Sequence, residues 1–351
     1  MEKIGKISPS ALERLVFPFQ GKKREEVIWG AQLGRDCGVV QLGKELISLT
    51  CDPITGSSFH LGLLATQVVV NDLICSGAEP VALLVTLIFP PGVSEAEIET
   101  TMRELDEAGR ELGVSIIGGH TEISEAVNRS IIHCTGLGWI KDGYLPDVSK
   151  IEAGDYIVMT KGAGIEGTAI LFSEREKEWQ NLLDEATINQ GKEFWKMMSV
   201  FREGKIALPF HPHALHDATE GGVLGAIWEA CTSRGLGFEI EEEKILIYPQ
   251  TQALVKLLNL DPLKLISSGT LLIFTPAPLP LLQALREVVP AEAIGKVTEE
   301  PTKIVIRRNG EREEIKECPK DELWRIMQSV KKNWEINFSL TGASSGGCWD
   351  W

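Results

Sequence analysis

Three aspartates occur where the predicted chain turns or where an apolar run is interrupted. Asp36 precedes a short apolar run in LGRDCGVV, and Asp52 ends the predicted strand ISLTCD before Pro53, which is expected to stop that strand. Asp72 lies inside an otherwise apolar segment, VVVNDLIC, where an unpaired carboxylate would be costly to bury. Asp36 and Asp52 are also compatible with ordinary turn residues. Asp72 is therefore the strongest indication of a paired or cation-bound carboxylate.

A fourth acid follows a glycine pair in the stretch IIGGHTEIS, residues 116–124. Glycines at a strand end permit either a tight turn or a close approach to the backbone. In the second case the amides of Gly118 and Gly119 would bind phosphate oxygens, with Glu122 beside them. Carboxylates without cysteine ligands suit Mg²⁺, which often bridges to phosphates. A nucleoside triphosphate held through magnesium is one hypothesis, and a plain turn is the other.

A second polar group occupies residues 209–222, PFHPHALHDATEGG. Its titratable residues are His211, His213, His216, Asp217 and Glu220. One interpretation is a zinc-dependent hydrolase that uses the three histidines, although a proline separates the first two and no H-E-x-x-H motif is present. Another is that Asp217 and Thr219 cap a helix beginning at residues 220–222, whose free amides would attract an anion.

Strands and helices alternate along the chain, which predicts an α/β protein. Strands are expected at residues 45–52, 81–89, 114–119 and 130–140, and a buried helix at 61–77. An amphipathic helix is expected at 94–113, with Ser94 and Glu97 forming a capping box and Gly113 ending it. A polar link, KDGYLPDVSKIEAGD, predicts a boundary near residue 150. We expect an N-terminal domain over 1–150, a C-terminal domain over 151–318, and a helix (321–334) with a flexible tail over 319–351.

Composition limits the classes of partner. The 351 residues carry a net charge of −15, with a sequence pI near 5.0, which argues against nucleic acid. The first residues lack an apolar signal core, and no run reaches the roughly 18 apolar residues of a membrane span. The seven cysteines are widely spaced, without a C-x-x-C pair. We therefore predict a cytoplasmic protein with reduced thiols and no membrane partner.

The motif GAGIEG at residues 162–167 matches a dinucleotide-binding pattern, but its context does not. That site also requires an acid about 20 residues further on, at the end of a second strand. Asp184 and Glu185 have this spacing but lie in a charged, helix-like stretch. We expect these glycines to pack a strand against a helix instead.

The order of these motifs resembles the aminoimidazole-ribonucleotide synthetase (PurM-like) superfamily, and most closely its hydrogenase-maturation members, the HypE proteins. The resemblance rests on Asp36, TCD at 50–52, VNDLICSGAEP at 70–80, GGHTE at 118–122 and HDATEGG at 216–222. It implies a two-domain fold with an N-terminal ATP-binding domain, a homodimer joined through its strands, and ATP sites at the dimer interface. It also implies ATP-dependent activation of a small substrate, by phosphorylation or dehydration, possible hydrogenase maturation, and a maturation partner protein.

Site roles follow from the same resemblance, residue by residue. Asp36, Asp52 and Asp72 would hold Mg²⁺, with Glu122 as a further ligand. Gly118, Gly119, His120, Thr121 and Asn71 would contact ATP. His216, Asp217 and Glu220 would line the acceptor pocket, where His216 or Glu220 would transfer a proton.

The chain departs from the family pattern at three places. Arg35-Asp36 stands where many relatives have two aspartates, and His120 stands where several have an acid. HypE proteins end in a Pro-Arg-Ile-Cys tail, whereas here Cys348 is followed by three more residues. These departures are also compatible with a non-catalytic ATP-binding partner protein.

Overall fold

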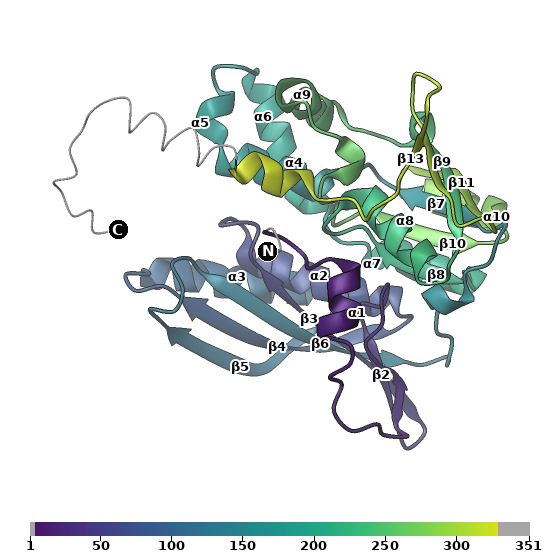
Figure 1. Cartoon of the computed structure of the whole chain (residues 1–351). Coiled ribbons are helices and arrows are strands. Elements are labelled where there is room, and N and C mark those ends of the chain that lie inside the picture. The colour runs from purple at the N-terminus through teal and green to yellow at the C-terminus, as the bar shows by residue number, and fades with distance from the viewer. Residues whose placement is uncertain (1–3, 329–351) are drawn as a thin grey trace.

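The computed structural model describes residues 4–328, which form two β-sheets with helices packed between and around them (Figure 1). The first sheet has six strands in the order β1-β2-β3-β6-β4-β5, and the second has seven in the order β13-β12-β9-β11-β7-β10-β8. Strands β1–β6 end by residue 140 and β7–β13 begin at residue 156, so each half of the chain builds one sheet. This arrangement confirms the predicted mixed α/β fold.

The strands are β1 (Val27–Trp29), β2 (Gly38–Leu42), β3 (Glu45–Ile54), β4 (Glu79–Phe89), β5 (Ser115–Ile123), β6 (Ile131–Ile140), β7 (Tyr156–Thr160), β8 (Ala214–Asp217), β9 (Gly237–Glu241), β10 (Leu271–Thr275), β11 (Ala291–Thr298), β12 (Lys303–Ile306) and β13 (Arg312–Glu314). The α-helices are α1 (Pro9–Leu15), α2 (Leu61–Cys75), α3 (Glu95–Leu112), α4 (Ile165–Glu174), α5 (Glu176–Trp179), α6 (Glu185–Lys192), α7 (Phe201–Ala207), α8 (Gly222–Thr232), α9 (Pro249–Leu258) and α10 (Pro278–Arg286). Short 3-10 turns include η1 (Val148–Lys150), η2 (Glu193–Met197), η3 (Leu208–Phe210), η4 (Glu242–Lys244) and η5 (Pro262–Lys264), and residues 322–328 are helical.

Strand β3 runs further than the sequence indicated. The prediction that Pro53 ends this strand is wrong, because β3 continues to Ile54 and pairs with β6 along that length. Its other neighbour, β2, pairs only as far as Leu49. Pro53 therefore lies where that edge of β3 has no partner strand, so its missing N–H costs no ladder hydrogen bond.

Helices α2 and α3 cover one face of the first sheet, as Figure 1 shows. Helix α3 has the predicted capping box at Ser94 and Glu97, and Gly113 ends it in the left-handed conformation. Helix α2 is different because it is apolar nearly all round, with 14 buried residues out of 15. It contacts its own sheet, α3, and both β8 and α7 of the second half, so it is a central helix of the whole molecule.

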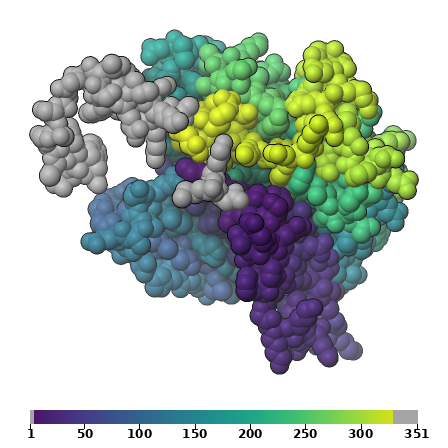
Figure 2. Space-filling view, viewed as in Figure 1, coloured from purple at the N-terminus to yellow at the C-terminus, as the bar shows by residue number. Residues whose placement is uncertain are grey.

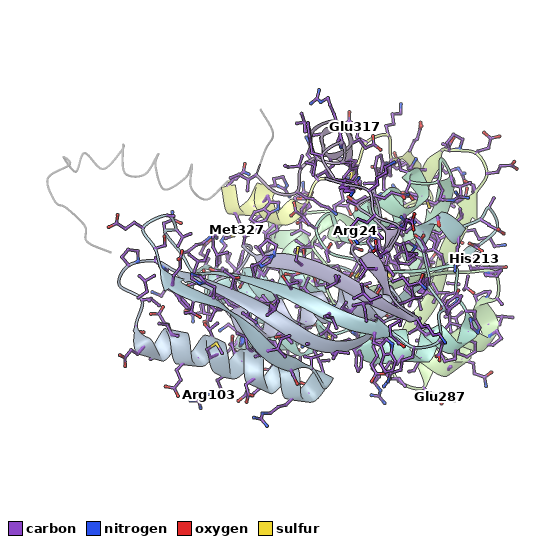
Figure 3. The ribbon with its side chains drawn as sticks, turned by 90° about the horizontal axis from the view of Figure 1, so that it is seen from below. Arg24, Arg103, His213, Glu287, Glu317 and Met327 are labelled. Atoms are coloured by element: carbon purple, nitrogen blue, oxygen red, sulfur yellow. The ribbon has the colours of Figure 1, made fainter. Side chains whose placement is uncertain are left out.

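On the opposite face of the first sheet, no helix of residues 4–328 is packed. Figure 3, seen from below, looks onto these strands, and Arg103 marks the outer side of α3 beside them. Exposed apolar side chains on these strands include Val81, Leu84 and Trp139. An apolar sheet face of this kind is characteristic of a surface that another protein covers.

The GAGIEG segment joins β7 to α4 in the way expected for packing glycines. Gly164 caps α4 in the left-handed conformation, and a Cβ at Gly167 would lie 2.4 Å from Leu265 Cγ. Asp184 caps α6 by accepting the backbone N–H of Thr187. The acid found at the dinucleotide-site spacing, Asp184, therefore serves as a helix cap and not as a contact for a ribose.

One of the hydrophobic clusters spans the two halves. Leu64 of α2, Phe172 of α4 and Leu323 of the 322–328 segment belong to the same buried cluster. The N-terminal segment before α1 runs between the two halves (Figure 1), and in the space-filling view the purple N-terminal region lies at the surface beside them (Figure 2). Within residues 4–328, no helix combines the length and the apolar character needed to cross a bilayer.

Candidate active site

Four aspartates gather where the two halves meet, and we call them the acidic cluster: Asp36, Asp52, Asp72 and Asp217. Asp36 precedes β2, Asp52 is on β3, Asp72 is in α2, and Asp217 ends β8 of the second sheet. Oxygen or nitrogen atoms of Asp36, Asp217 and the neighbouring His216 lie within 4.8 Å of one another. The structure thus brings together residues that are up to about 180 positions apart in the sequence.

Thr50 fixes the part of the cluster that belongs to the first half. Its hydroxyl lies 2.7 Å from Asp72 Oδ2 and 2.8 Å from the backbone oxygen of Asp36. Burial raises the pKa of Asp72 well above its ordinary value, and the charge of Asp52 raises it further. Burial also raises the pKa of Asp52. Without a cation, the cluster therefore favours protonation of these buried carboxyls.

His216 joins the second half to Asp36. Its Nδ1 lies 2.8 Å from Asp36 Oδ2. Burial lowers the pKa of His216, but the charge and hydrogen bond of Asp36 more than offset this, so that the pKa is raised to about 9. Burial likewise opposes the ionisation of Asp36, and the charge and hydrogen bond of His216 reverse it, so the pKa of Asp36 is lowered. At neutral pH the two groups form a charged pair.

Asp217 is the member of the acidic cluster whose carboxylate lacks hydrogen-bond partners within residues 4–328. It is 1% exposed, and neither carboxylate oxygen has a hydrogen-bond partner. Burial, followed by the charge of Asp36, raises the pKa of Asp217 to about 7. A buried carboxylate without a partner costs free energy unless it binds a proton or a cation.

This donor set fits a hard divalent cation. The cluster offers four carboxylates, and Mg²⁺ prefers such oxygen ligands. The neighbouring Cys37 thiol donates to the Asp72 carbonyl, and burial raises the pKa of that thiol to about 12, so it stays protonated and is a poor ligand. Asp217 supplies free oxygens directed into the cluster. The one nearby imidazole is already engaged by Asp36. The ligand prediction thus gains Asp217, which the sequence had suggested as a catalytic residue.

Arg35 takes no part in the cluster, although it precedes Asp36. Its guanidinium donates to both oxygens of Asp147, at 3.0 and 2.5 Å, and lies 5.1 Å from the Trp29 ring. A bidentate pair of this kind fixes the side chain firmly. Where many relatives have a first aspartate, this chain therefore has Arg35, which forms a structural ion pair with Asp147 beside the site.

Glu220 follows His216 and Asp217 along the chain and lines a cavity of about 440 Å³. One of its oxygens, Oε1, accepts the backbone N–H of Lys6 at 2.5 Å. The cavity lies between the N-terminal segment, the start of α8 and the 318–328 segment. The expected side-chain cap on α8 is absent: its N-cap residue is Gly221, and no side chain of residues 4–328 accepts a hydrogen bond from the first turn. The N–H of Gly221 itself donates to Asp321 Oδ2 at 2.6 Å.

The glycine pair lies inside a strand and not at its end. Strand β5 continues through Gly118 and Gly119 to Ile123, at the edge of the sheet beyond β6 and β4. A Cβ at Gly119 would lie 1.8 Å from the Val85 carbonyl oxygen, so glycine permits close pairing of β4 and β5 across a register shift. The predicted turn is therefore wrong, and the close approach is made by a neighbouring strand.

The polar residues after the glycines lie away from the acidic cluster of the same chain. His120 Nε2 and Glu122 Oε2 are 3.1 Å apart and exposed. Through the ladder, Glu122 is opposite Ile88 and His120 opposite Thr86, on the face away from α2, whereas Thr121 alternates to the other side. Three strand spacings separate β5 from β3, roughly 14 Å. One chain alone does not join Glu122 to Asp52.

Asn71 is occupied by the protein itself. Its Nδ2 donates to the Met198 carbonyl at 2.9 Å, and its Oδ1 accepts the Val200 N–H at 2.8 Å. These bonds tie α2 to the second half. The predicted contact between Asn71 and ATP therefore has no support in its hydrogen bonds.

The three histidines proposed for zinc do not converge. His211 packs edge-on against Tyr144, with ring centroids 4.6 Å apart, and His213 Nδ1 lies 2.8 Å from Asp155 Oδ2. His213, labelled in Figure 3, lies in the second half, whereas His216 turns to Asp36. The geometry contradicts a shared zinc site.

Two residues near the cluster were missed in the sequence. Thr50 lies two positions before Asp52 and so on the same strand face, a spacing that could have revealed it. Lys6 interacts electrostatically with Asp36 and Asp52, but it lies in a short N-terminal segment without a motif. Cys348, the tail residue considered earlier, lies outside residues 4–328.

Comparison with known families decides the relationship. Residues 34–140 match the N-terminal domain of AIR synthase related proteins, and residues 152–308 match the C-terminal domain. The chain belongs to the AIR synthase-related family. This confirms the resemblance seen in the motifs, and the acidic cluster lies where the two matched regions meet.

The relatives include hydrogenase-maturation proteins. A putative hydrogenase expression/formation protein of Methanocaldococcus jannaschii is 31% identical over 67% of this chain and 69% of its own length. Carbamoyl dehydratase HypE of Cupriavidus necator is 28% identical over 60% of this chain, but the match spans only 58% of that relative. The relatives thus agree on family over the matched regions.

Solved structures share the fold. HypE in a complex with HypF has a TM-score of 0.73 at 21% identity, with coverage of 88% of this chain and 99% of that chain. HypE in complex with ATP has a TM-score of 0.69 at 22% identity, with coverage of 89% and 93%. At these identities the likeness establishes the two-domain fold.

Proposed function

We propose that this protein is an ATP-dependent enzyme of the HypE type, which activates an oxygen atom of a small substrate by phosphorylation. The observation that carries the proposal is the acidic cluster, where Asp217 presents two buried oxygens without partners. A cation and the phosphates of ATP would satisfy these oxygens and relieve the repulsion among the carboxylates. Relatives named carbamoyl dehydratase, and a HypE structure containing ATP, support the choice of reaction.

Asp36, Asp52, Asp72 and Asp217 would hold Mg²⁺, which when bound would neutralise phosphate charge and orient the terminal phosphoryl group. His216 keeps the Asp36 carboxylate ionised and fixed in direction. Thr50 orients Asp72 through its hydroxyl. These contacts from the two halves position the ligand oxygens before the nucleotide arrives.

The substrate would enter from the cavity beside Glu220. Its oxygen attacks the terminal phosphorus of ATP, the bond to the bridging oxygen breaks, and ADP leaves with that electron pair. If the substrate is a carbamoyl group, the oxygen then leaves as phosphate and the nitrogen loses two protons, which yields a nitrile. Glu220 would accept one of these protons, since its side chain lines the cavity.

A homodimer and a maturation partner belong to the same proposal. The uncovered face of the first sheet, with Val81, Leu84 and Trp139 exposed, is suited to a second copy. In such a dimer, residues 118–122 of β5 in one copy would lie close to the acidic cluster of the other copy. The HypE structure solved with HypF supports a protein partner.

Calorimetric titration with ATP tests the proposal, with Mg²⁺ present and with excess chelator as control. We expect binding near one ATP per chain that requires Mg²⁺, followed by phosphate release when a carbamoylated acceptor is supplied. Binding without turnover on any acceptor would support the non-catalytic alternative. Absence of magnesium-dependent binding would contradict both.

A further inference from the structure

The N-terminal segment is attached to the second half at the edge of the acidic cluster. The backbone N–H of Lys6 donates to Glu220 Oε1 at 2.5 Å, and its Nζ lies 3.1 Å from Glu229 Oε2. Gly5 lies against Trp324, since a Cβ there would come within 2.7 Å of the indole ring. A short segment from the start of the chain thus closes one side of the site.

Lys6 brings a positive charge to this point. Its side chain is 42% exposed and lines the 440 Å³ cavity together with Glu220 and Glu229. On the other side, its ammonium group is near enough to Asp36 and Asp52 to interact electrostatically with both carboxylates. Lys6 therefore lies between the cavity and the carboxylates that would hold the metal.

The other cations near Asp36 are already committed. Arg35 is fixed by the bidentate pair with Asp147, and His216 is fixed by Asp36 itself. Lys6 differs because its ion-pair partner within residues 4–328, Glu229, is on the cavity wall and because a lysine stem can reorient. Phosphates are a better partner than one carboxylate for a partly exposed ammonium group.

We propose that Lys6 is a nucleotide-contacting residue, whose ammonium group leaves Glu229 and binds the terminal phosphate of ATP while the N-terminal backbone stays attached to Glu220. The inference rests on the proposed function, because it needs ATP in the acidic cluster. Lys6 would let the protein distinguish ATP from ADP, and it lies in a segment that contains no recognisable sequence motif. Glu229 is the resting partner that holds the ammonium ready.

The test compares ATP and ADP binding, with Mg²⁺ present, in the full chain and in Lys6→Met. We expect the substitution to weaken ATP binding about tenfold and ADP binding less than twofold, because only ATP carries the terminal phosphate. Lys6→Arg keeps the charge and should stay within about threefold of the unchanged protein for ATP. Lys22→Met, at an exposed lysine outside the site, is the matched control and should change neither constant.

Glu229→Gln separates phosphate contact from a structural ion pair. If Glu229 only restrains Lys6, this substitution should leave ATP binding unchanged or tighten it. Equal losses for ATP and ADP in Lys6→Met, a loss in Glu229→Gln matching that in Lys6→Met, or an Arg variant as weak as the Met variant would each overturn the inference. ATP binding by the unchanged protein is measured first, and its absence would instead defeat the proposed function.

Discussion

His216 Nδ1 and Asp36 Oδ2 lie 2.8 Å apart and join the second half of the molecule to the first at the candidate site. The pair orients a carboxylate that faces the remaining aspartates, so its effect should appear in metal and nucleotide affinity. His216 has little rotational freedom, because it is 4% exposed within β8.

His216→Gln should weaken magnesium-dependent ATP binding by roughly 10- to 100-fold, the usual effect of losing a residue that orients a metal ligand. Gln keeps a polar group but not the positive charge that holds Asp36 ionised. Calorimetry measures the change. His213→Gln is the matched control, since His213 pairs with Asp155 outside the cluster. Similar losses in the two variants would show that the effect is not specific to the pair.

Asp72→Asn should reduce ATP affinity by roughly 100-fold or more while leaving the fold intact. The pKa of Asp72 lies well above its ordinary value because of burial and the nearby Asp52 charge. The neutral amide therefore resembles the form that the protein favours without metal. Thermal unfolding without Mg²⁺ should be unchanged or raised in temperature. Asp106→Asn, on the exposed side of α3, serves as control, and unchanged ATP affinity in Asp72→Asn would contradict the metal assignment.

Glu166→Gln should stabilise the protein at alkaline pH. Burial raises the pKa of Glu166 from an ordinary 4.5 to about 7, and its Oε2 has no partner. Between these values the folded protein holds a proton that the unfolded chain has lost, so the free energy of unfolding falls as pH rises through this interval. The loss amounts to as much as about 3 kcal/mol above pH 7.

Urea unfolding at pH 4.5 and pH 8 checks this prediction. The Gln variant should gain most at pH 8 and little at pH 4.5. Glu178→Gln, at an exposed glutamate of the neighbouring helix α5, should show no such difference. An equal gain at both pH values would mean that packing, and not ionisation, is responsible.

Leu84→Lys should separate the proposed homodimer. Leu84 is 47% exposed on the uncovered face of the first sheet, so a charge there would be buried at unfavourable cost in a dimer. Sedimentation velocity should show the monomer mass, and ATP binding should fall if the two copies share the site. Leu279→Lys, at the 77% exposed Leu279 of α10, should leave the mass unchanged. A monomer in both the variant and the unchanged protein would exclude the dimer.

Local signals in the sequence predicted much of the fold. Helix α3 follows its capping box and its final glycine because those contacts lie within a few residues. The prediction that Pro53 ends β3 was wrong because a strand edge without a partner tolerates proline. Sequence alone does not show which edge of a strand is paired. The glycine pair misled for a related reason, since the group that approaches Gly119 is the backbone of β4.

The sequence indicated individual residues of the candidate site, but not which of them lie close together in the fold. Asp72 was identified because a carboxylate in an apolar helix needs a partner. In the structure Asp72 is buried, and the Thr50 hydroxyl donates to it. The proximity of Asp217 to Asp36 depends on how the two sheets meet, which no local pattern encodes. The same holds for Asp321, which accepts the N–H of Gly221 from 100 positions away, and for Asn71, whose partners are backbone atoms of residues 198 and 200.

Helix α2 has consequences for how the chain is made. It is apolar nearly all round, and part of its cover comes from α7 and β8, which end about 140 residues later. At synthesis rates of about 5 to 20 residues per second, an apolar helix stays uncovered on the ribosome for on the order of ten seconds. The N-terminal half released alone would present this surface permanently. It should therefore aggregate or bind chaperones, and the two halves should reach their native state only together.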